Sequence, residues 1–238
     1  LTEREAMLAE RAGGPITLRH VLVRDLSRGR AAVVDPALLT DDPAEALDDP
    51  EVSVVVEVMG GLEPARTHVL QALRAGKRVV TANKALVATH GPELLAAARR
   101  GGGGLHFEAA AAGAIPIVKA VRESLASNRV EALLGIVNGT CNYILSQMSA
   151  HGTSFADALA EAQRLGYAEA DPSSDVGGQD SAFKLALLAG LAFDCHVPVQ
   201  DIACEGITSI RAADIAMARE LGGVIKLLAV ATPHEAGI

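Results

Sequence analysis

Short apolar runs rich in β-branched residues recur along the first half of the chain and alternate with helical patterns. The runs predict strands at 20–26, 52–60, 78–84 and 105–111. Residues 64–76 predict a helix, with Pro64 in its first turn and Gly76 just past its end. Such alternation is typical of a parallel sheet with crossover helices. The glycines at 101–104 precede a strand instead of following one, which favours a loose loop over a phosphate-binding turn.

From about residue 129 the order of predicted elements changes. The elements are, in chain order, a strand at 129–137, helices near 140–150, 154–165 and 179–193, a strand at 202–210, a helix near 212–221 and a strand at 224–232. The predicted fold class is therefore α/β, a partial doubly wound (Rossmann-like) nucleotide-binding sheet followed by an α+β domain. We place the boundary near Ser127, which separates residues 1–126 from residues 127–238.

Composition excludes several classes of protein. The chain has 238 residues, half of them apolar, enough for one large domain or two modest ones. It contains neither the ~20 uncharged apolar residues of a membrane span nor a secretory signal, so we expect a cytoplasmic protein without membrane partners. A net charge of −8, with only four Phe and two Tyr, also argues against nucleic acid as a partner.

The three cysteines are Cys141, Cys195 and Cys204. Their number is odd and no CxxC spacing occurs, which argues against a disulfide framework and against a zinc site. We expect them to be small buried residues.

The strongest candidate site lies in EADPSSDVGGQDSAFKLALLAG, residues 169–190, where charged residues precede an almost wholly apolar helical pattern. The charged residues are Glu169, Asp171, Asp175, Asp180 and Lys184. Asp180 and Lys184 are four positions apart and share a helix face, and a surface pair of that kind contributes only about 0.3–0.5 kcal/mol. A helix that is apolar nearly all round is instead buried, which places the pair at its entrance and favours a site.

Several carboxylates beside one lysine suit a small ligand that carries an ammonium group and a reactive oxygen. The carboxylates would bind the ammonium, and the lysine would bind the oxygen. The alternative is a divalent metal, but no histidine accompanies the acids and a lysine is a poor neighbour for a cation. We therefore rank metal catalysis well below binding of such a ligand.

Four further stretches could bind a ligand where predicted strands end. TANKALVATHG places Lys84, and VEVMGG places the glycines at 60–61, at the edge where open α/β sheets bind ligands. GIVNGTCNYIL breaks at Asn138, after which free N–H groups at a helix start could bind a carboxylate. FEAAAAGAIPI has Glu108 at a strand end. The plain structural interpretations are an exposed turn lysine for Lys84 and a strand–turn–helix joint at Asn138, and from the residues alone we interpret Glu108 as an ordinary loop acid.

Taken together, these stretches resemble the homoserine dehydrogenase family, in the same order and over essentially the whole chain. The matching stretches are VVVEVMGGLEPA, VVTANKALVATHG, FEAAAAGAIPI, GIVNGTCNYILSQM, EAQRLGYAEADPSSDVGGQDSAFKLALLA and EGITSI. The resemblance implies an NAD(P)-dependent oxidoreductase that reversibly reduces L-aspartate 4-semialdehyde to L-homoserine in threonine, methionine and isoleucine biosynthesis. It also implies a homodimer or larger homo-oligomer, an NAD(P)-binding domain at 1–126 and a catalytic and dimerisation domain at 127–238.

The resemblance also implies roles for individual residues. Lys184 and Lys84 would flank the reacting oxygen, and Asp180 would position Lys184. The implied substrate-binding residues are Glu169, Asp175, Tyr167, Asn138, Gly139 and Thr140, and the implied cofactor contacts are Met59, Gly60 and Lys84. A monovalent cation, usually sodium in the family, would be held by Glu108 and by the backbone carbonyls of Ala111, Gly113 and Ile115. Ala111 and Ala112 stand where the family more often has Val and Gly, a difference that backbone ligands tolerate.

The implied reaction needs a proton at the aldehyde oxygen as the hydride reaches the aldehyde carbon. Lys184 is the predicted donor, and a charged lysine would also stabilise the developing alkoxide. Nearby carboxylates favour the ammonium form and burial opposes it, and the sequence leaves that balance open. Arg24, close to the end of an early strand, favours the 2′-phosphate of NADP over NAD.

The first residues form a helical, Glu- and Arg-rich run at 1–14. We therefore expect the chain to begin after the family's first strand and Gly-rich cofactor turn, and to stop before the family's closing segments. On that expectation the chain alone binds cofactor poorly. Two alternatives stay open, namely another two-domain dehydrogenase acting on an amino-acid-like substrate and a non-catalytic dimerising module.

Overall fold

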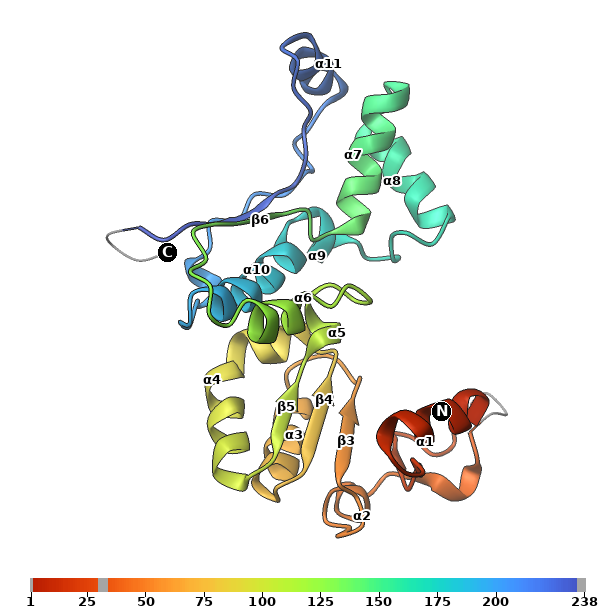
Figure 1. Cartoon of the computed structure of the whole chain (residues 1–238). Helices are drawn as coiled ribbons and strands as arrows, with labels where there is room; N and C mark the ends of the chain where they lie inside the picture. The colour runs from red at the N-terminus through yellow and green to blue at the C-terminus, as the bar shows by residue number, and fades with distance from the viewer. Residues whose placement is uncertain (1, 30–33, 235–238) are drawn as a thin grey trace.

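In a computed structural model, two lobes of the chain meet at the long helix α10 (Gln179–Ala192), as Figure 1 shows. The structure describes residues 2–29 and 34–234, so Leu1, the first residue of the predicted helical run, lies outside the described residues. The α-helices are α1 (Glu5–Ala12), α2 (Pro43–Leu47), α3 (Ala65–Arg74), α4 (Lys84–Gly101), α5 (Glu108–Ala111), α6 (Ile117–Lys119), α7 (Gly139–His151), α8 (Phe155–Arg164), α9 (Ser173–Val176), α10 (Gln179–Ala192) and α11 (Ala212–Glu220). The strands are β1 (Val21–Leu22), β2 (Leu39–Thr40), β3 (Val54–Glu57), β4 (Arg78–Thr81), β5 (Gly104–His106), β6 (Leu133–Gly135) and β7 (Ala229–Ala231).

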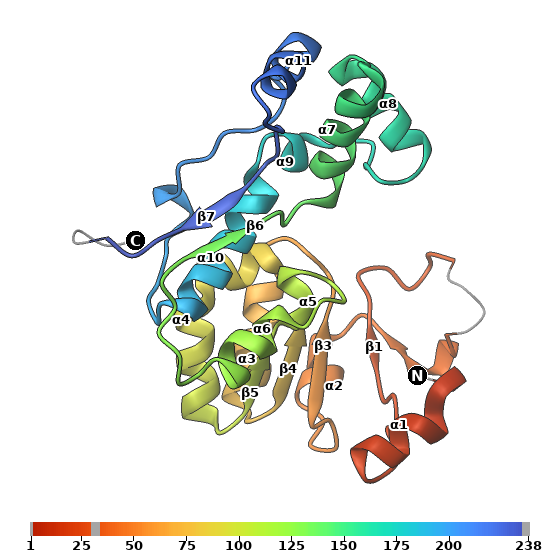
Figure 2. The same cartoon turned by 45° about the horizontal axis from the view of Figure 1, so that its top comes forward.

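Strands β3, β4 and β5 form a parallel sheet in that order, with Val54 opposite Arg78 and Val79 opposite Leu105. Helices α3 and α4 connect these strands and pack against each other beside the sheet (Figure 1). Strands β1 and β2 form a separate parallel pair beyond β3 (Figure 2). These elements, with α1 and α2, make up the sheet lobe, and they confirm the predicted parallel sheet with crossover helices.

The apolar run of β3 is covered on one face only. Val54 and Val56 are 47% and 64% exposed, whereas the side chain of Glu57 is buried. A continuous apolar run is typical of a strand covered on both faces. In the described part of the chain α3 and α4 cover a single face, so alternate residues of β3 and β4 stay exposed.

Helix α10 packs against both lobes. Leu187 and Leu188 belong to the core of the sheet lobe, whereas Leu185 and Ala189 pack against β7. The helix also contacts α4, α9 and β6. Its burial on nearly all sides confirms what its apolar pattern predicts, and it places the first turn of α10 where the two lobes meet.

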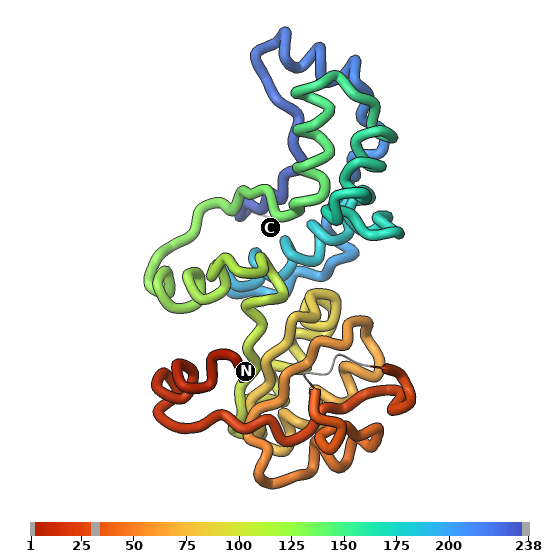
Figure 3. The backbone as a smooth tube through the Cα atoms, turned by 90° about the vertical axis from the view of Figure 1, so that its right-hand side faces the viewer, coloured from red at the N-terminus to blue at the C-terminus, as the bar shows by residue number. Residues whose placement is uncertain are grey.

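The second lobe, here the helical lobe, contains the other elements from β6 onward. Strands β6 and β7 pair antiparallel, with Leu133 opposite Ala231. Helix α7 packs against α8 and α11 around a core that includes Ile144, Leu145 and Met148. Figure 3 shows these helices at the end of the molecule opposite the N-terminal segment.

The prediction of a strand at 202–210 is wrong. The Ile207 N–H donates to the carbonyl of Val176 at the end of α9, at 2.8 Å, and no strand partner pairs with this described segment. A Cβ on Gly206 would overlap that same carbonyl oxygen. Ile207 and Ile210 pack into the core of the helical lobe, and apolar alternation alone does not distinguish such burial from burial in a sheet.

The glycines at 101–104 precede a strand, as predicted, but the connection is tightly packed and not loose. Gly101 ends α4 and Gly104 begins β5. A Cβ on Gly101 would overlap the carbonyl oxygen of Leu73, and one on Gly103 would overlap that of Lys77. Gly101 and Gly103 are required as glycines because the α4–β5 connection lies directly on the α3–β4 connection.

The cysteines are unpaired and differ in exposure. Cys141 is buried, whereas Cys195 and Cys204 are exposed, so the expectation of burial is wrong for those two. Within the described ranges, no helix has both the length and the apolar composition needed to cross a membrane.

Candidate active site

The first two turns of α10 hold a buried ion pair. Lys184 Nζ lies 2.6 Å from Asp180 Oδ2 and donates a second hydrogen bond to the carbonyl of Val137 at 2.9 Å. The side chains of Asp180 and Lys184 are only 5% and 18% exposed. This burial rules out the surface ion pair that the sequence left as an alternative.

Lys84 reaches the same carboxylate from the sheet lobe. It is the first residue of α4, and its Nζ lies 3.0 Å from Asp180 Oδ1. Its side chain is 40% exposed, more than that of Lys184. One carboxylate thus holds two ammonium groups, one from each lobe, and the two lysines singled out in the sequence lie together.

Asn138 connects this carboxylate to a second one. Its Nδ2 donates to Asp175 Oδ1 at 2.7 Å and to Asp180 Oδ2 at 2.9 Å. Its Oδ1 accepts the Cys141 N–H at 2.8 Å, which caps the N-terminus of α7. We refer to Lys84, Asn138, Asp175, Asp180 and Lys184 as the lysine–carboxylate cluster.

The cluster keeps Asp180 ionised. Burial by itself would raise the pKa of Asp180, but hydrogen bonds from Lys184 and Asn138, and the charge of Lys184, outweigh burial and lower the pKa below its ordinary value. Burial also raises the pKa of the Cys141 thiol to about 12, and the charges of Asp175 and Asp180 add to that rise. Cys141 is therefore a neutral thiol and no nucleophile.

A second polar network fixes the loop between β3 and α3. The buried Glu57 carboxylate accepts hydrogen bonds from Thr81 Oγ1 at 2.5 Å, from the Met59 N–H at 2.8 Å and from the Gly60 N–H at 3.2 Å. Asn83 Nδ2 donates to the Gly61 carbonyl at 2.7 Å while its Oδ1 caps α4. The network thus ties the predicted cofactor residues Met59 and Gly60 to the start of the helix that carries Lys84.

Sequence reasoning did not single out Glu57 or Thr81. The available signal was an acid at the end of an otherwise apolar strand, at the edge where open sheets bind ligands. A buried carboxylate needs partners, and the neighbouring strand β4 ends with the hydroxyl of Thr81.

The remaining predicted substrate residues lie around the start of α7. Thr140 Oγ1 donates to the Tyr167 carbonyl at 2.8 Å, and the Tyr167 ring stacks on Tyr143 with centroids 4.6 Å apart. Gly139 is the first residue of α7. Glu169 is exposed, and among the contacts of the described residues its carboxylate has none with either lysine.

Arg24 and Glu108 are two further predicted residues that lie outside the lysine–carboxylate cluster. Arg24 is exposed just after the carboxyl end of β1. Glu108 accepts the Val118 N–H at 2.9 Å and the Lys119 N–H at 2.8 Å, so its carboxylate holds the chain around α6. Of the predicted carbonyl ligands, that of Ile115 already accepts the Ile117 N–H at 2.8 Å. Within the described residues, no group of three or more His, Cys, Asp or Glu side chains could hold a metal ion.

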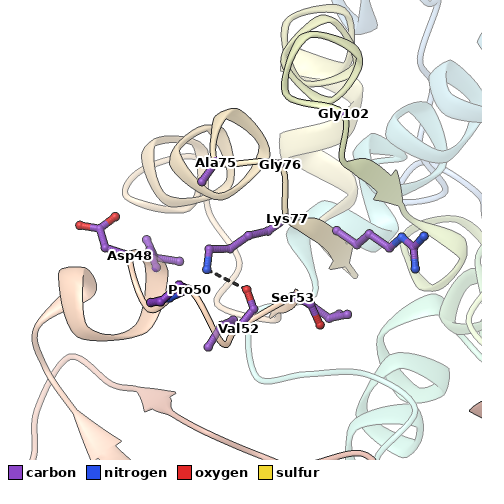
Figure 4. A pocket seen from close by; sticks show the side chains of 11 residues that line it. Asp48, Pro50, Val52, Ser53, Ala75, Gly76, Lys77 and Gly102 are labelled. Atoms are coloured by element: carbon purple, nitrogen blue, oxygen red, sulfur yellow. Dashed lines mark hydrogen bonds between the residues drawn. The ribbon is translucent and has the colours of Figure 1, made fainter. Parts of the chain in front are cut away.

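A hollow of about 660 Å³ lies at the opposite edge of the sheet (Figure 4). Lys77 points into its wall, but its Nζ donates to the carbonyls of Asp49 and Val52 at 2.6 and 2.7 Å. This lysine therefore holds the 49–52 loop against the start of β4, and the hollow lies away from the strand ends that carry Lys84.

Comparison with known proteins follows the same division of the chain. A family model described as "Homoserine dehydrogenase, NAD binding domain" matches residues 3–108, and one described as "Homoserine dehydrogenase" matches residues 116–238. The homoserine dehydrogenase of Corynebacterium glutamicum is 52% identical over 97% of this chain and 52% of its own length. The chain spans about half the length of the curated relatives it matches.

Solved structures agree with the sequence comparisons. A homoserine dehydrogenase from Thiobacillus denitrificans superposes with a TM-score of 0.91 at 49% identity, over 98% of this chain and 54% of that one. A hyperthermophilic archaeal homoserine dehydrogenase in complex with NADPH gives a TM-score of 0.68 at 28% identity, over 80% and 56% of the two chains.

The parallel sheet and its match to an NAD-binding domain model first define a class, that of proteins whose open α/β sheet binds a dinucleotide cofactor. Within that class the chain belongs to the homoserine dehydrogenase family.

Proposed function

We propose that this chain contributes the active site of a homoserine dehydrogenase, which interconverts L-aspartate 4-semialdehyde and L-homoserine with NADP or NAD. The observation that carries the proposal is the Asp180 carboxylate, whose two oxygens hold Lys184 at 2.6 Å and Lys84 at 3.0 Å. Two ammonium groups fixed by one buried carboxylate suit a single ligand oxygen that gains negative charge during reaction.

In this proposal Asp180, Lys184 and Lys84 have separate roles. The nicotinamide cofactor, when bound, supplies or accepts the hydride at the substrate carbon. In the reducing direction Lys184 donates a proton from Nζ to the aldehyde oxygen, and Lys84 stabilises the negative charge that develops on it. Asp180 orients both lysines, so their positions are set before the substrate binds.

The amino-acid end of the substrate would lie toward α7 and α9. Asp175 and Glu169 supply negative charge for its ammonium group, and Tyr167 lines the same region. The N–H groups of Gly139 and Thr140 start α7, where helical N–H groups lack partners within the helix and attract a carboxylate. A Cβ placed on Gly139 would meet nothing within 4 Å, which leaves room for a ligand there.

The cofactor would lie along the carboxyl edge of the sheet, against Met59, Gly60 and Lys84. Gly60 has a φ of 74° and open space where a side chain would stand, so its backbone is accessible to a flat ligand. Arg24, exposed after β1, would bind the 2′-phosphate and favour NADP. The NADPH complex of the archaeal relative is consistent with this choice.

We also propose a cytoplasmic homodimer formed through the outer face of the β6–β7 sheet. Leu134 and Val230 are paired across the two strands and are 67% and 49% exposed. Ile136 and Leu228 extend the same apolar face. A second copy would bury this patch, as expected for contiguous exposed apolar surface. The sodium site at Glu108 stays a prediction from the resemblance, and the pathway roles in threonine, methionine and isoleucine synthesis stay predictions with it.

The test is the homoserine-dependent reduction of NADP, and of NAD, at alkaline pH. We would assay the chain alone and a longer protein that contains it and has the length of its relatives. The decisive variant is Lys184→Ala, which removes the proton donor and should reduce the rate by at least 10²-fold, the usual contribution of general acid–base catalysis being about 10²–10⁴. Lys119→Ala, at a 67% exposed lysine, is the matched control and should keep full activity.

Three outcomes are informative. Activity that Lys184→Ala abolishes and Lys119→Ala keeps supports the proposal. A folded chain that binds cofactor but leaves homoserine unchanged points to another amino-acid-type dehydrogenase. A folded chain that binds neither cofactor nor substrate, at either length, supports the non-catalytic dimerising module.

A further inference from the structure

The buried side chain of Asn138 links the two parts of the lysine–carboxylate cluster. We propose that Asn138 is a positioning residue that sets the spacing between Asp175 and Asp180, and that it makes no direct contact with substrate. Its consequence for catalysis rests on the proposed function, because Asp175 would bind the ammonium end of the substrate and Asp180 orients the lysines at the reacting end.

The orientation of the Asn138 amide follows from its partners. Two carboxylate oxygens and one backbone N–H surround it, and an ionised carboxylate can only accept whereas an N–H can only donate. The nitrogen must therefore face Asp175 and Asp180, and the oxygen must face Cys141.

No N–H of the Asn138 amide is left for a ligand. Both are used by the carboxylates, at 2.7 and 2.9 Å, and the residue is only 3% exposed. The resemblance places Asn138 among the substrate-binding residues, but its geometry points to a different role, in which it positions the acids that bind the substrate. The neighbouring Gly139 and Thr140 remain the residues of this turn that can meet the substrate.

We call the two hydrogen bonds from Asn138 Nδ2 to Asp175 and Asp180 the Asn138 bridge. The bridge determines how far apart the two ends of a substrate can bind. Asp175 comes from α9 and Asp180 from α10, with two glycines at 177–178 between them in the chain. Two negative charges so close would repel one another, and a shared donor nitrogen holds both within hydrogen-bond distance. Because one amide nitrogen holds both acids, the distance between the position for the ammonium group and the position for the reacting oxygen is fixed.

The same bridge affects the charge on Asp180. The groups that face Asp180 are Lys184 from its own helix, Lys84 from α4, Asn138 and the Cys141 thiol from the α7 end, and Asp175 from α9. The hydrogen bond from Asn138 is one of the interactions that lower the pKa of Asp180. Losing it should raise that pKa, so Asp180 would become protonated, and release the lysines, at a higher pH than in the wild type.

The best variant is Asn138→Ser. Serine is a good N-cap residue and can keep the bond to the Cys141 N–H, but its side chain is too short to bridge two carboxylates. Asn138→Asp also keeps a cap acceptor while adding a third negative charge in place of the donor. Asn142→Ser is the control, because Asn142 lies on the same helix and contacts Lys226 instead of the cluster.

We would measure these variants in whichever length of the protein oxidises homoserine. Asn138→Ser should lower kcat and raise KM for homoserine, each by at least tenfold, while KM for NADP changes less than twofold. The acid limb of the kcat/KM profile should move to higher pH, and Asn138→Asp should lose more activity than Asn138→Ser. Asn142→Ser should match the wild type. An increase in KM for homoserine alone, with kcat and the pH profile unchanged, would overturn the proposal in favour of direct substrate contact, and unchanged kinetics would overturn it altogether.

A measurement without turnover separates this inference from the proposed function. Carbon-13 NMR titration of the Asp180 carboxyl in the wild type and in Asn138→Ser needs only folded protein. A raised pKa of Asp180 in Asn138→Ser supports the positioning role of Asn138 even if the protein proves inactive on homoserine. An unchanged pKa contradicts that role even if the protein proves active.

Discussion

At the scale of single residues, Asp180 determines the orientation of the Lys84 and Lys184 side chains, because it pairs with both and is itself buried. Asp180→Asn keeps the size of the side chain and removes the charge. We expect activity to fall about 10²-fold, since both lysines lose their orientation, and stability to fall by about 3 kcal/mol, since removing one member of a buried pair leaves charge uncompensated. Kinetics and urea unfolding measure the two effects, with Asp201→Asn, at an exposed acid, as the control.

The lowered pKa of Asp180 also makes a prediction about stability against pH. A carboxyl whose pKa is lower in the folded than in the unfolded state stabilises the fold fully above its unfolded pKa, near 3.8 here, and this contribution is lost as pH falls further through the folded value. Unfolding free energy should therefore drop more steeply below pH 4 in the wild type than in Asp180→Asn, which cannot titrate. Parallel pH profiles for the two proteins would contradict the assigned cause.

At the scale of elements, the β3–α3 loop depends on Glu57, which holds the Met59 and Gly60 N–H groups. Glu57→Gln weakens these bonds to a charged acceptor, and we expect KM for the cofactor to rise about tenfold with kcat nearly unchanged. Glu63→Gln is the matched control, because Glu63 lies farther along the same loop and is 52% exposed. Equal cofactor KM values for Glu57→Gln and wild type would show that the loop holds its shape without this network.

The α4–β5 connection provides a test of packing between elements. A Cβ on Gly103 would overlap the carbonyl oxygen of Lys77, and backbone cannot move aside as a side chain can. Gly103→Ala should therefore destabilise the fold by about 1–3 kcal/mol, the usual cost of overpacking. Gly14→Ala has open space and should change little, so urea unfolding of both variants isolates the steric effect.

Much of the fold and of the candidate site could be predicted from the sequence, because the local pattern of apolar and polar residues determines local structure. The apolar run after Lys184 predicts the buried helix α10, and the strand ends at 57–61 and 81–84 predict the ligand edge of the sheet. The two hydrogen bonds of Asn138 could not be predicted, since its partners lie 37 and 42 positions away and are brought together only by the packing of α7 against α9 and of α9 against α10. The strand predicted at 202–210 is wrong for the same reason, because long-range packing of Ile207 and Ile210 into the core of the helical lobe determines the shape of that segment.

At the scale of the whole molecule, α10 joins the two lobes. Its residues Leu187 and Leu188 complete the core of the sheet lobe although they lie in the second half of the chain. The predicted domains 1–126 and 127–238 stay a prediction, and on that division they would share a core. Such sharing suits an active site in which Lys84 and Lys184 come from different lobes, because a common core restricts their relative motion.

The outer face of β6–β7 makes the last prediction at this scale. Single exposed apolar residues are common, but Leu134, Ile136, Leu228 and Val230 form one continuous face on two paired strands. If a second copy covers this face, Leu134→Lys places a charge inside the interface without a partner, and the dimer should dissociate to monomers in analytical ultracentrifugation. Leu221→Lys, at an 83% exposed residue just after α11, is the control and should stay dimeric. A Leu134→Lys protein that stays dimeric would show that the dimer interface lies elsewhere. A wild type that is monomeric at all concentrations would show that a different partner covers this apolar face.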